Sequence, residues 1–413
     1  MKSKKFVVIA ILYLVLCIGN NLIHPITTPF LESLQIDKVF FGYYYALMAF
    51  GVVVGAMVCG VLSNKVSRKY LTCIGFIGYA FFQMFFGTIN FNPYIVMIWR
   101  FLSGFFVAFP NTLFIVFAAD ELKQEERVKG LTIMSLISLL GVSLGYEIGG
   151  LMHDYVFFDN YLASFILQSG WTILGAVLCF IIMDDLKVQT KKGTALIPVI
   201  KSLNIKQVIF FVSLFIFSLA SISVSKFFEP LFQSIGDKES VSTYLAHFTT
   251  VSNLISILVI WFLVPVIKKR FEKRSSLLFT VLLGISSILI LVTFSSRKND
   301  VLTILFFSVY LVYVIIKNLI TPLEQDITIE DVGEDKFGPL LSFRQSILSF
   351  GQVLGPLFLA NACSYDMHLP FFIAAVFYFA GFILMIIYLS LNKRDNKRDV
   401  KKNDKTRKKY MVK

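Results

Sequence analysis

Three charged residues, Arg100, Glu147 and Lys317, interrupt long stretches of sequence that contain no other Asp, Glu, Lys or Arg. An ionised side chain in such an apolar stretch is costly to bury, so each marks a candidate functional site. Arg100 and Glu147 fall at similar depths on consecutive predicted helices, which favours a pair between them. A paired carboxylate that becomes neutral on protonation can act as a proton switch, whereas a permanent ion pair would only brace the helices.

The elements that must hold these residues are twelve apolar runs. The chain is 56% hydrophobic and only 16% charged, against roughly 25% charged residues in soluble domains. Most runs reach the ~20 residues that a helix needs to cross a bilayer, and strands of a β-barrel would instead alternate apolar with polar residues. The sequence therefore predicts an all-α integral membrane protein with twelve transmembrane helices. The runs cover residues 6–31, 39–64, 70–99, 101–119, 130–146, 160–183, 207–225, 240–267, 275–296, 301–316, 345–365 and 367–392.

The net charge of +13 is explained by where the basic residues fall. With a cytoplasmic N-terminus, 31 of the 39 Lys and Arg lie on the cytoplasmic side and four lie in outer loops. Basic residues are retained on that side of membrane helices, which predicts a multi-pass protein of the cell membrane with both termini cytoplasmic. The charge therefore indicates contact with the lipid bilayer and not with nucleic acid.

The chain divides into two six-helix halves, which we expect to be related by pseudo-symmetry. Pro110 precedes a Gly-xxx-Gly pair at 141–145, and Pro322 precedes a similar pair at 351–355. Two related halves around a central site are a common transporter design. The predicted units are a first half at 1–183, a cytoplasmic linker with a short amphipathic helix at 184–206, a second half at 207–391 and a basic cytoplasmic tail at 392–413.

Four motifs add a more specific signal. They are residues 60–69 (GVLSNKVSRK), Arg100-xxx-Gly104-xxx-Ala108, Gly141-xxx-Gly145-Tyr146-xx-Gly149-Gly150 and residues 19–25 (GNNLIHP). With them the chain resembles, over essentially its whole length, the major facilitator superfamily, and in particular its twelve-helix drug:proton antiporters. Three positions depart from the family pattern, since Asn64 replaces Asp, Ser67 replaces Gly and Tyr146 replaces Pro.

The resemblance implies a gate on the cytoplasmic side. The family's acidic residue at position 64 is thought to latch onto helix eleven, where Arg344 would be the partner. Asn64 cannot form an ion pair, so we expect a weaker latch. Arg68, next to it in the loop, and Asp326, on helix ten, are further candidates for this gate.

The resemblance also implies a central cavity lined by helices one, four, seven and ten. Lys226 and Glu229, three residues apart near the outer end of helix seven, are expected to pair and to extend toward water instead. The candidate cavity residues are Asn20, Asn21, His24, Lys317 and Glu324.

Small residues mark close helix packing. Gly141, Gly145 and Gly149 share one face of helix five, and Gly355 lies on helix eleven. Small residues let two helix backbones approach closely in lipid. The resemblance places the face of helix five against the other half, as a pivot or a seal, and ordinary close packing is the alternative.

Several functions remain open, and an enzyme is disfavoured. The chain has no GxxxxGK[ST] phosphate-binding loop, no CxxC pair and no metal or nucleophile motif, so we expect no cofactor and no metal. The leading hypothesis is a secondary active transporter, a monomer that exports small amphipathic molecules or drugs by alternating access, coupled to protons. The alternatives are an importer or exchanger of a small anionic metabolite, and a sensor or lipid-translocating protein on the same fold.

Overall fold

The computed structural model describes residues 4–36, 38–63, 65–89, 92–122, 124–183, 203–235, 241–270, 275–295, 300–329 and 337–411. Across these ranges, twelve helical segments are long and apolar enough to cross a membrane, which confirms the predicted helix count. The predicted linker helix lies in 184–206, most of which falls outside the described residues.

Seven α-helices and a π-helical turn form the first bundle. α3 packs on α5, α5 on α4, α4 on α7, and α1 on α6. Aromatic side chains such as Phe76, Tyr79 and Phe114 fill the core of this bundle. Its elements are α1 (Lys4–Asn21), α2 (His24–Ser33), α3 (Lys38–Leu62), α4 (Arg68–Thr88), α5 (Pro93–Asp120), α6 (Gln124–Leu151), η1 (Met152–Val156) and α7 (Tyr161–Ile182).

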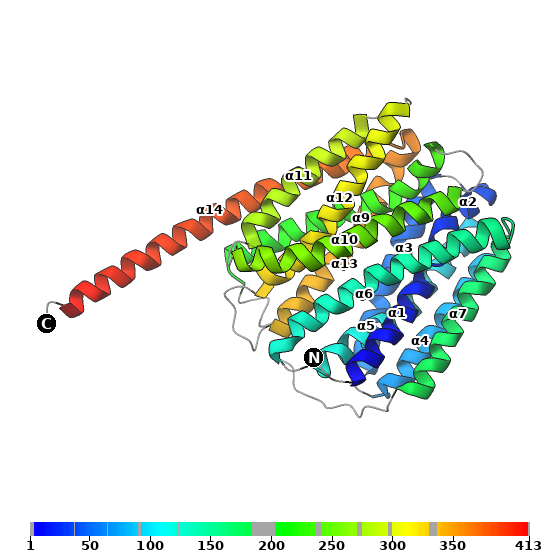
Figure 1. Ribbon diagram of the computed structural model, residues 1–413, viewed down its shortest axis with the longest axis horizontal. Coiled ribbons are helices and arrows are strands. Elements are labelled where there is room, and N and C mark those ends of the chain that lie inside the picture. Colours follow the sequence, from blue (N-terminus) through cyan, green and yellow to red (C-terminus); the bar gives the residue numbers. More distant parts are fainter. Residues whose placement is uncertain are drawn as a thin grey trace.

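Six described helices form the second bundle. α9 packs on α13 and α14, while α11 packs on α12 and α14. Figure 1 shows this bundle beside the first, with α14 continuing past it to the C-terminal end. The helices are α9 (Ile205–Ile235), α10 (Val241–Arg270), α11 (Ser275–Ser295), α12 (Asp300–Ile329), α13 (Phe337–Tyr365) and α14 (Leu369–Met411).

Local sequence sets the helix boundaries that matter for the site. The first span is broken between α1 and α2, because Pro25 has no N–H to donate to the preceding turn. α5 begins after Asn92, whose side-chain oxygen accepts a hydrogen bond from the Tyr94 N–H at 2.8 Å. Pro93 takes the first helical position, where a missing N–H leaves no bond unmade.

The two bundles meet mainly through α6 against α10 and α3 against α13. We call the end of the molecule where α1 begins the terminal face, and the other end the distal face. Leu136 and Leu139 of α6 pack near mid-height against Ile260 of α10 and Leu319 of α12. Closer to the distal face, a Cβ on Gly42 of α3 would lie 2.6 Å from the Pro356 carbonyl oxygen of α13.

The glycines of α6 lie against α1, in their own bundle. A Cβ on Gly141 would lie 2.3 Å from the Cys17 Cβ, and one on Gly149 would lie 1.8 Å from the Leu22 carbonyl oxygen. Gly145 meets the same helix, at the Ile18 carbonyl. The expectation that this face meets the other half is therefore wrong, because all three glycines lie against α1 or Leu22, which follows it, in the same bundle.

The second bundle uses the same device at the matching place. A Cβ on Gly355 of α13 would lie 2.6 Å from the Leu219 carbonyl oxygen of α9. Gly150, one position beyond the α6 stripe, is the residue that faces the other bundle, with the Ser242 carbonyl of α10 2.9 Å from its ideal Cβ. The glycine stripe of α6 and Gly355 of α13 therefore pack within their own bundles, and other residues form the interface between the bundles.

Gly149→Ala tests this packing. The added methyl group has no room against the Leu22 carbonyl, so we expect a loss of stability of about 1–3 kcal/mol, typical of overpacking. The apparent Tm of the purified protein in detergent measures it. Gly170→Ala is the matched control, because nothing lies within 4 Å of its Cβ position. Equal Tm values for the two variants would contradict the proposed role of the glycine stripe.

Candidate functional site

A buried carboxylate, Glu229 of α9, joins the two bundles. Glu229 is only 3% exposed to solvent. Tyr45 of α3 donates its hydroxyl hydrogen bond to Glu229 Oε2 at 2.9 Å, and Tyr146 of α6 donates to Oε1 at 2.7 Å. Both oxygens of this second-bundle carboxylate are thus held by tyrosines of the first bundle.

Two nitrogen-containing side chains, His24 and Lys226, complete this group. His24 is the first residue of α2, and its Nδ1 lies 3.9 Å from Glu229 Oε1. The imidazole ring stacks on the Tyr146 ring, with 5.7 Å between centroids and planes 6° apart. The Lys226 ammonium lies 4.8 Å from the centre of the Tyr45 ring. We call these five residues, His24, Tyr45, Tyr146, Lys226 and Glu229, the Glu229 cluster.

The surroundings of Glu229 differ from those that the sequence predicts. A pair between Lys226 and Glu229 that extends toward water was expected, but the carboxylate points into the bundle interface and bonds two tyrosines. The available signal was Tyr146, which replaces the family's proline in the helix-five motif. A tyrosine in an apolar helix brings a hydroxyl that needs a partner when it is buried, and the partner here is Glu229.

Arg100 of α5 is enclosed by neutral groups. It is 1% exposed, and its guanidinium lies 4.2 Å from the centre of the Tyr44 ring and 5.6 Å from that of Phe86. It donates hydrogen bonds to Gln83 Oε1, at 3.3 Å, and to the sulfur of Met48. The predicted Arg100–Glu147 pair is therefore not formed, because Arg100 is enclosed by side chains of α3 and α4 whereas Glu147 pairs with His247 of α10.

A chain of amides connects Arg100 to the first helix. Gln83, which binds Arg100, donates from Nε2 to the Tyr79 hydroxyl at 2.9 Å. Gln168 of α7 donates to that same hydroxyl at 3.0 Å and to the Gly19 carbonyl of α1 at 2.9 Å. The cation is thereby linked through polar groups to the end of α1, next to the break that precedes His24.

Glu147 has its partner in the other bundle. Its Oε1 lies 2.7 Å from Nδ1 of His247 on α10, and the two side chains are 27% and 48% exposed. Polar contacts between the bundles also include the Thr250 hydroxyl, which donates to the Ser143 carbonyl at 3.0 Å. In addition to Glu229, the interface thus contains a second and more exposed carboxylate, Glu147.

The predicted cavity residues are spread over both bundles. Lys317 of α12 donates from Nζ to the Ser225 hydroxyl of α9 at 2.7 Å. Asn21 donates from Nδ2 to the Cys17 carbonyl at 2.7 Å, within α1. The Asn20 Oδ1 is buried and has no hydrogen-bond donor among the described residues. Of the predicted cavity residues, His24 is the one that belongs to the Glu229 cluster.

The predicted gate residues bind partners within their own bundles. Arg344 of α13 donates to Glu324 of α12, and both side chains are buried. Arg68 donates to Asp120 at 2.8 Å, across the terminal ends of α4 and α5. Asn64 and the side chain of Asp326 lie outside the part of the chain that the structure describes.

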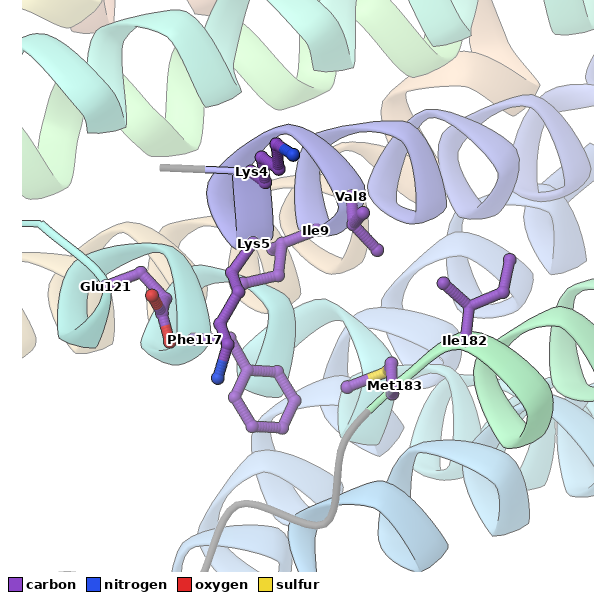
Figure 2. A pocket seen from close by; sticks show the side chains of 8 residues that line it. All are labelled: Lys4, Lys5, Val8, Ile9, Phe117, Glu121, Ile182 and Met183. Carbon is purple, nitrogen blue, oxygen red and sulfur yellow. The ribbon is translucent and has the colours of Figure 1, made fainter. Parts of the chain in front are cut away.

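A small pocket opens at the terminal end of the first bundle, away from these groups. Figure 2 shows side chains of α1 and of the ends of α5 and α7 around it, including the residue that follows each of these two helices, with two lysines and one glutamate among apolar groups. The pocket lies within one bundle and does not reach the interface. It is lined by Lys4, Lys5, Val8, Ile9, Phe117, Glu121, Ile182 and Met183.

The family model of the Major Facilitator Superfamily matches residues 9–338, so the chain belongs to this superfamily. It is 22% identical over 374 residues to the quinolone resistance protein NorA of Staphylococcus aureus strain MSSA476, covering 90% of this chain and 92% of that protein. The NorA of strain MRSA252 matches at 23% over 176 residues, 43% of this chain and 44% of that protein.

Solved structures share the fold. One is a bacterial homologue of the human lysosomal transporter Spinster, in an inward-facing and occupied conformation, with a TM-score of 0.75, 11% identity, and coverage of 94% of this chain and 97% of that one. Another is a point mutant of the nucleoside transporter NupG, with a TM-score of 0.69, 13% identity, and coverage of 94% and 99%. The chain is thus a multi-pass membrane transporter for small molecules, and not an enzyme.

The buried Arg344–Glu324 pair gives a stability test. Arg344→Ala leaves the Glu324 carboxylate buried without its partner, so we expect a loss of about 3–5 kcal/mol. The double variant Arg344→Met with Glu324→Gln removes both charges and should recover most of the stability. Apparent Tm values in detergent measure both effects. A double variant as unstable as Arg344→Ala would mean that the pair is not what stabilises this region.

Proposed function

We propose that the chain exports small amphipathic molecules in exchange for protons, with Glu229 as the residue that carries the proton. The observation that carries this proposal is the bonding of both Glu229 oxygens by tyrosines of the opposite bundle. Alternating access between two halves requires such contacts to form and break in every cycle.

Separation of the bundles at this level removes both tyrosine donors from Glu229. A carboxylate left in an apolar interior without donors is unfavourable, so it must take a new partner. A proton or a cationic molecule can serve, and the site holds one of them at a time. Competition for a single carboxylate is the simplest physical basis for exchange of a proton against a cation.

The neighbours of the carboxylate favour this role. His24, Tyr45 and Tyr146 contact Glu229 from three different helices of the first bundle, and the Lys226 ammonium lies over the Tyr45 ring. When Glu229 accepts a proton, one of its oxygens becomes a donor and the bond from a tyrosine on that side is weakened. Protonation therefore loosens the contact between the bundles, which is the coupling that an antiporter needs.

Direction and orientation complete the proposal. From the distribution of basic residues in the sequence we infer that the terminal face lies in the cytoplasm and the distal face outside, and we propose that the transporter works as a monomer. The polar contacts of Glu229 and Glu147 then lie toward the outside. The NorA proteins are named for quinolone resistance, and this likeness supports export in preference to import.

Glu229→Gln tests the coupling. We expect cationic dye transport in proteoliposomes, driven by an imposed proton gradient, to fall to the level of empty liposomes. The reason is that the Gln side chain, unlike a carboxylate, does not take up and release a proton during transport. Glu147→Gln is the matched control, since Glu147 is a carboxylate of the same interface and the coupling residue suggested by sequence alone. Normal gradient-driven transport by Glu229→Gln, with loss in Glu147→Gln, would transfer the role to Glu147.

A second candidate is an importer or exchanger of a small anionic metabolite. Two observations favour it, because the partners that the structure gives to Arg100 and Lys317 are neutral groups of the described residues. A cation without a counter-ion inside a membrane protein is suited to receive an anionic ligand. The structural neighbour NupG transports nucleosides, and its likeness to this chain extends to the fold alone.

A ligand panel separates the two candidates. Ligand that binds the folded state raises its stability, so Tm shifts of the purified protein report binding without an assumption about direction. We expect cationic amphipathic dyes to raise the Tm and organic anions to leave it unchanged. A rise with organic anions that is lost in Lys317→Met would instead support the anion carrier.

A further inference from the structure

A group of potential metal ligands lies at the distal face, outside the Glu229 cluster. α6 ends in the π-helical turn η1, and two residues with positive φ follow, Phe158 at 50° and Asp159 at 61°. This turn brings Asp159 back toward η1. As a result one ligand atom each from His153, Asp154 and Asp159 lies within 4.8 Å of the others.

The hydrogen bonds of His153 leave a lone pair facing this group. Its Nδ1 lies 3.0 Å from the Ser164 hydroxyl, and that hydroxyl donates to the Asn160 carbonyl at 3.4 Å. With Ser164 accepting from Nδ1–H, the proton of a neutral imidazole is on Nδ1 and Nε2 is the acceptor, and this is the tautomer that a metal at Nε2 requires. Metal-binding histidines are commonly fixed by a hydrogen bond of this kind.

The Nε2 atom faces a carboxylate and not a donor. It lies 3.7 Å from Asp159 Oδ1, beyond hydrogen-bond length. Two acceptors held face to face repel each other unless a cation lies between them. In tetrahedral zinc sites with bonds of ~2.0–2.1 Å, neighbouring ligand atoms are about 3.3 Å apart, so a small movement of Asp159 closes the site.

The imidazole is held in place, whereas Asp159 has room to adjust. The His153 residue is 2% exposed, and its ring packs 4.9 Å from the Tyr161 ring between centroids. The Asp159 side chain is 81% exposed. A rigid nitrogen ligand beside an oxygen ligand that is reached from solvent allows a cation to enter.

The third ligand connects this group to the other bundle. Asp154 Oδ2 accepts a hydrogen bond at 2.8 Å from the backbone N–H of Thr243, in the first turn of α10. Asp154 is at the same time one of the three residues of the metal-ligand group. Any cation at this site is therefore bound by a residue that also holds the second bundle.

We propose that His153, Asp154 and Asp159 bind a divalent cation of the zinc class at the distal face, and that its binding holds the two bundles together there. One imidazole and two carboxylates suit Zn²⁺, with water at the fourth position, and suit Mg²⁺ poorly. The sequence contains no metal motif, because the ligand from Asp159 depends on the turn. This inference does not depend on the proposed cargo or on proton coupling.

The first experiment measures binding to the purified full-length protein. We expect micromolar Zn²⁺, but not Mg²⁺, to raise the Tm of the wild type in detergent, and EDTA to reverse the rise. Asp159→Asn should abolish the shift, and the exposed position of this side chain means that the substitution leaves the core untouched. The matched control is Asp366→Asn, at another turn of the distal face, which should retain the shift.

Two outcomes would overturn the site. Either the wild type shows no shift with Zn²⁺, or Asp159→Asn responds as the wild type does. The first result would leave a protonated His153 paired with Asp159 as the explanation of the 3.7 Å contact. The second would assign the metal to other residues.

The second experiment tests the connection between the bundles. The five native cysteines are buried, so spin labels can be directed to cysteines introduced at Leu162 of α7 and Tyr244 of α10, which are both exposed. We expect Zn²⁺ to narrow the label–label distance distribution toward its short end, and to have no effect in the Asp159→Asn background. An unchanged distribution in the metal-bound wild type would overturn the bridging role.

Discussion

A polar group inside the hydrocarbon must find its partner within the protein, and this constraint organises the whole interface. Glu229 meets it with two tyrosines from the opposite bundle, and Glu147 meets it with a histidine. Arg100 meets it with amide, thioether and aromatic groups of its own bundle. In the proposed alternating-access cycle, bonds within a bundle would persist and bonds between the bundles would break, so the position of the partner would determine the role of each charged residue.

The sequence alone predicts the fold, but it does not predict which side chains the charged residues contact. Twelve helices follow from apolar length alone, since a helix in lipid satisfies its own backbone. The depths of Arg100 and Glu147 also follow from residue counts, but depth leaves the direction around the helix axis undetermined. The two side chains turn to different neighbours, Gln83 and His247, and only tertiary packing specifies that.

The sequence predicts that the glycine stripe of α6 is a packing surface, but it does not predict which helix packs there. Gly149 lies against the Leu22 carbonyl, at the break that Pro25 imposes on the first span. That carbonyl belongs to the same bundle, and the sequence contains nothing that distinguishes it from a carbonyl of the other half. The Glu229 cluster depends on this contact indirectly, because the break is where α2 begins and where His24 is placed.

The hydrogen bond from Thr243 to Asp154 has a consequence for the resting population of the transporter. The first N–H groups of a helix have no hydrogen-bond acceptor within that helix. In α10, the N–H of Thr243 donates to the Asp154 carboxylate of the other bundle. Loss of such a cap typically costs ~1 kcal/mol, and 1.4 kcal/mol is a factor of about ten in an equilibrium constant. In the proposed alternating-access cycle, opening of the distal face would break this bond, so the Asp154 carboxylate would shift the unloaded carrier several-fold toward closure on that side.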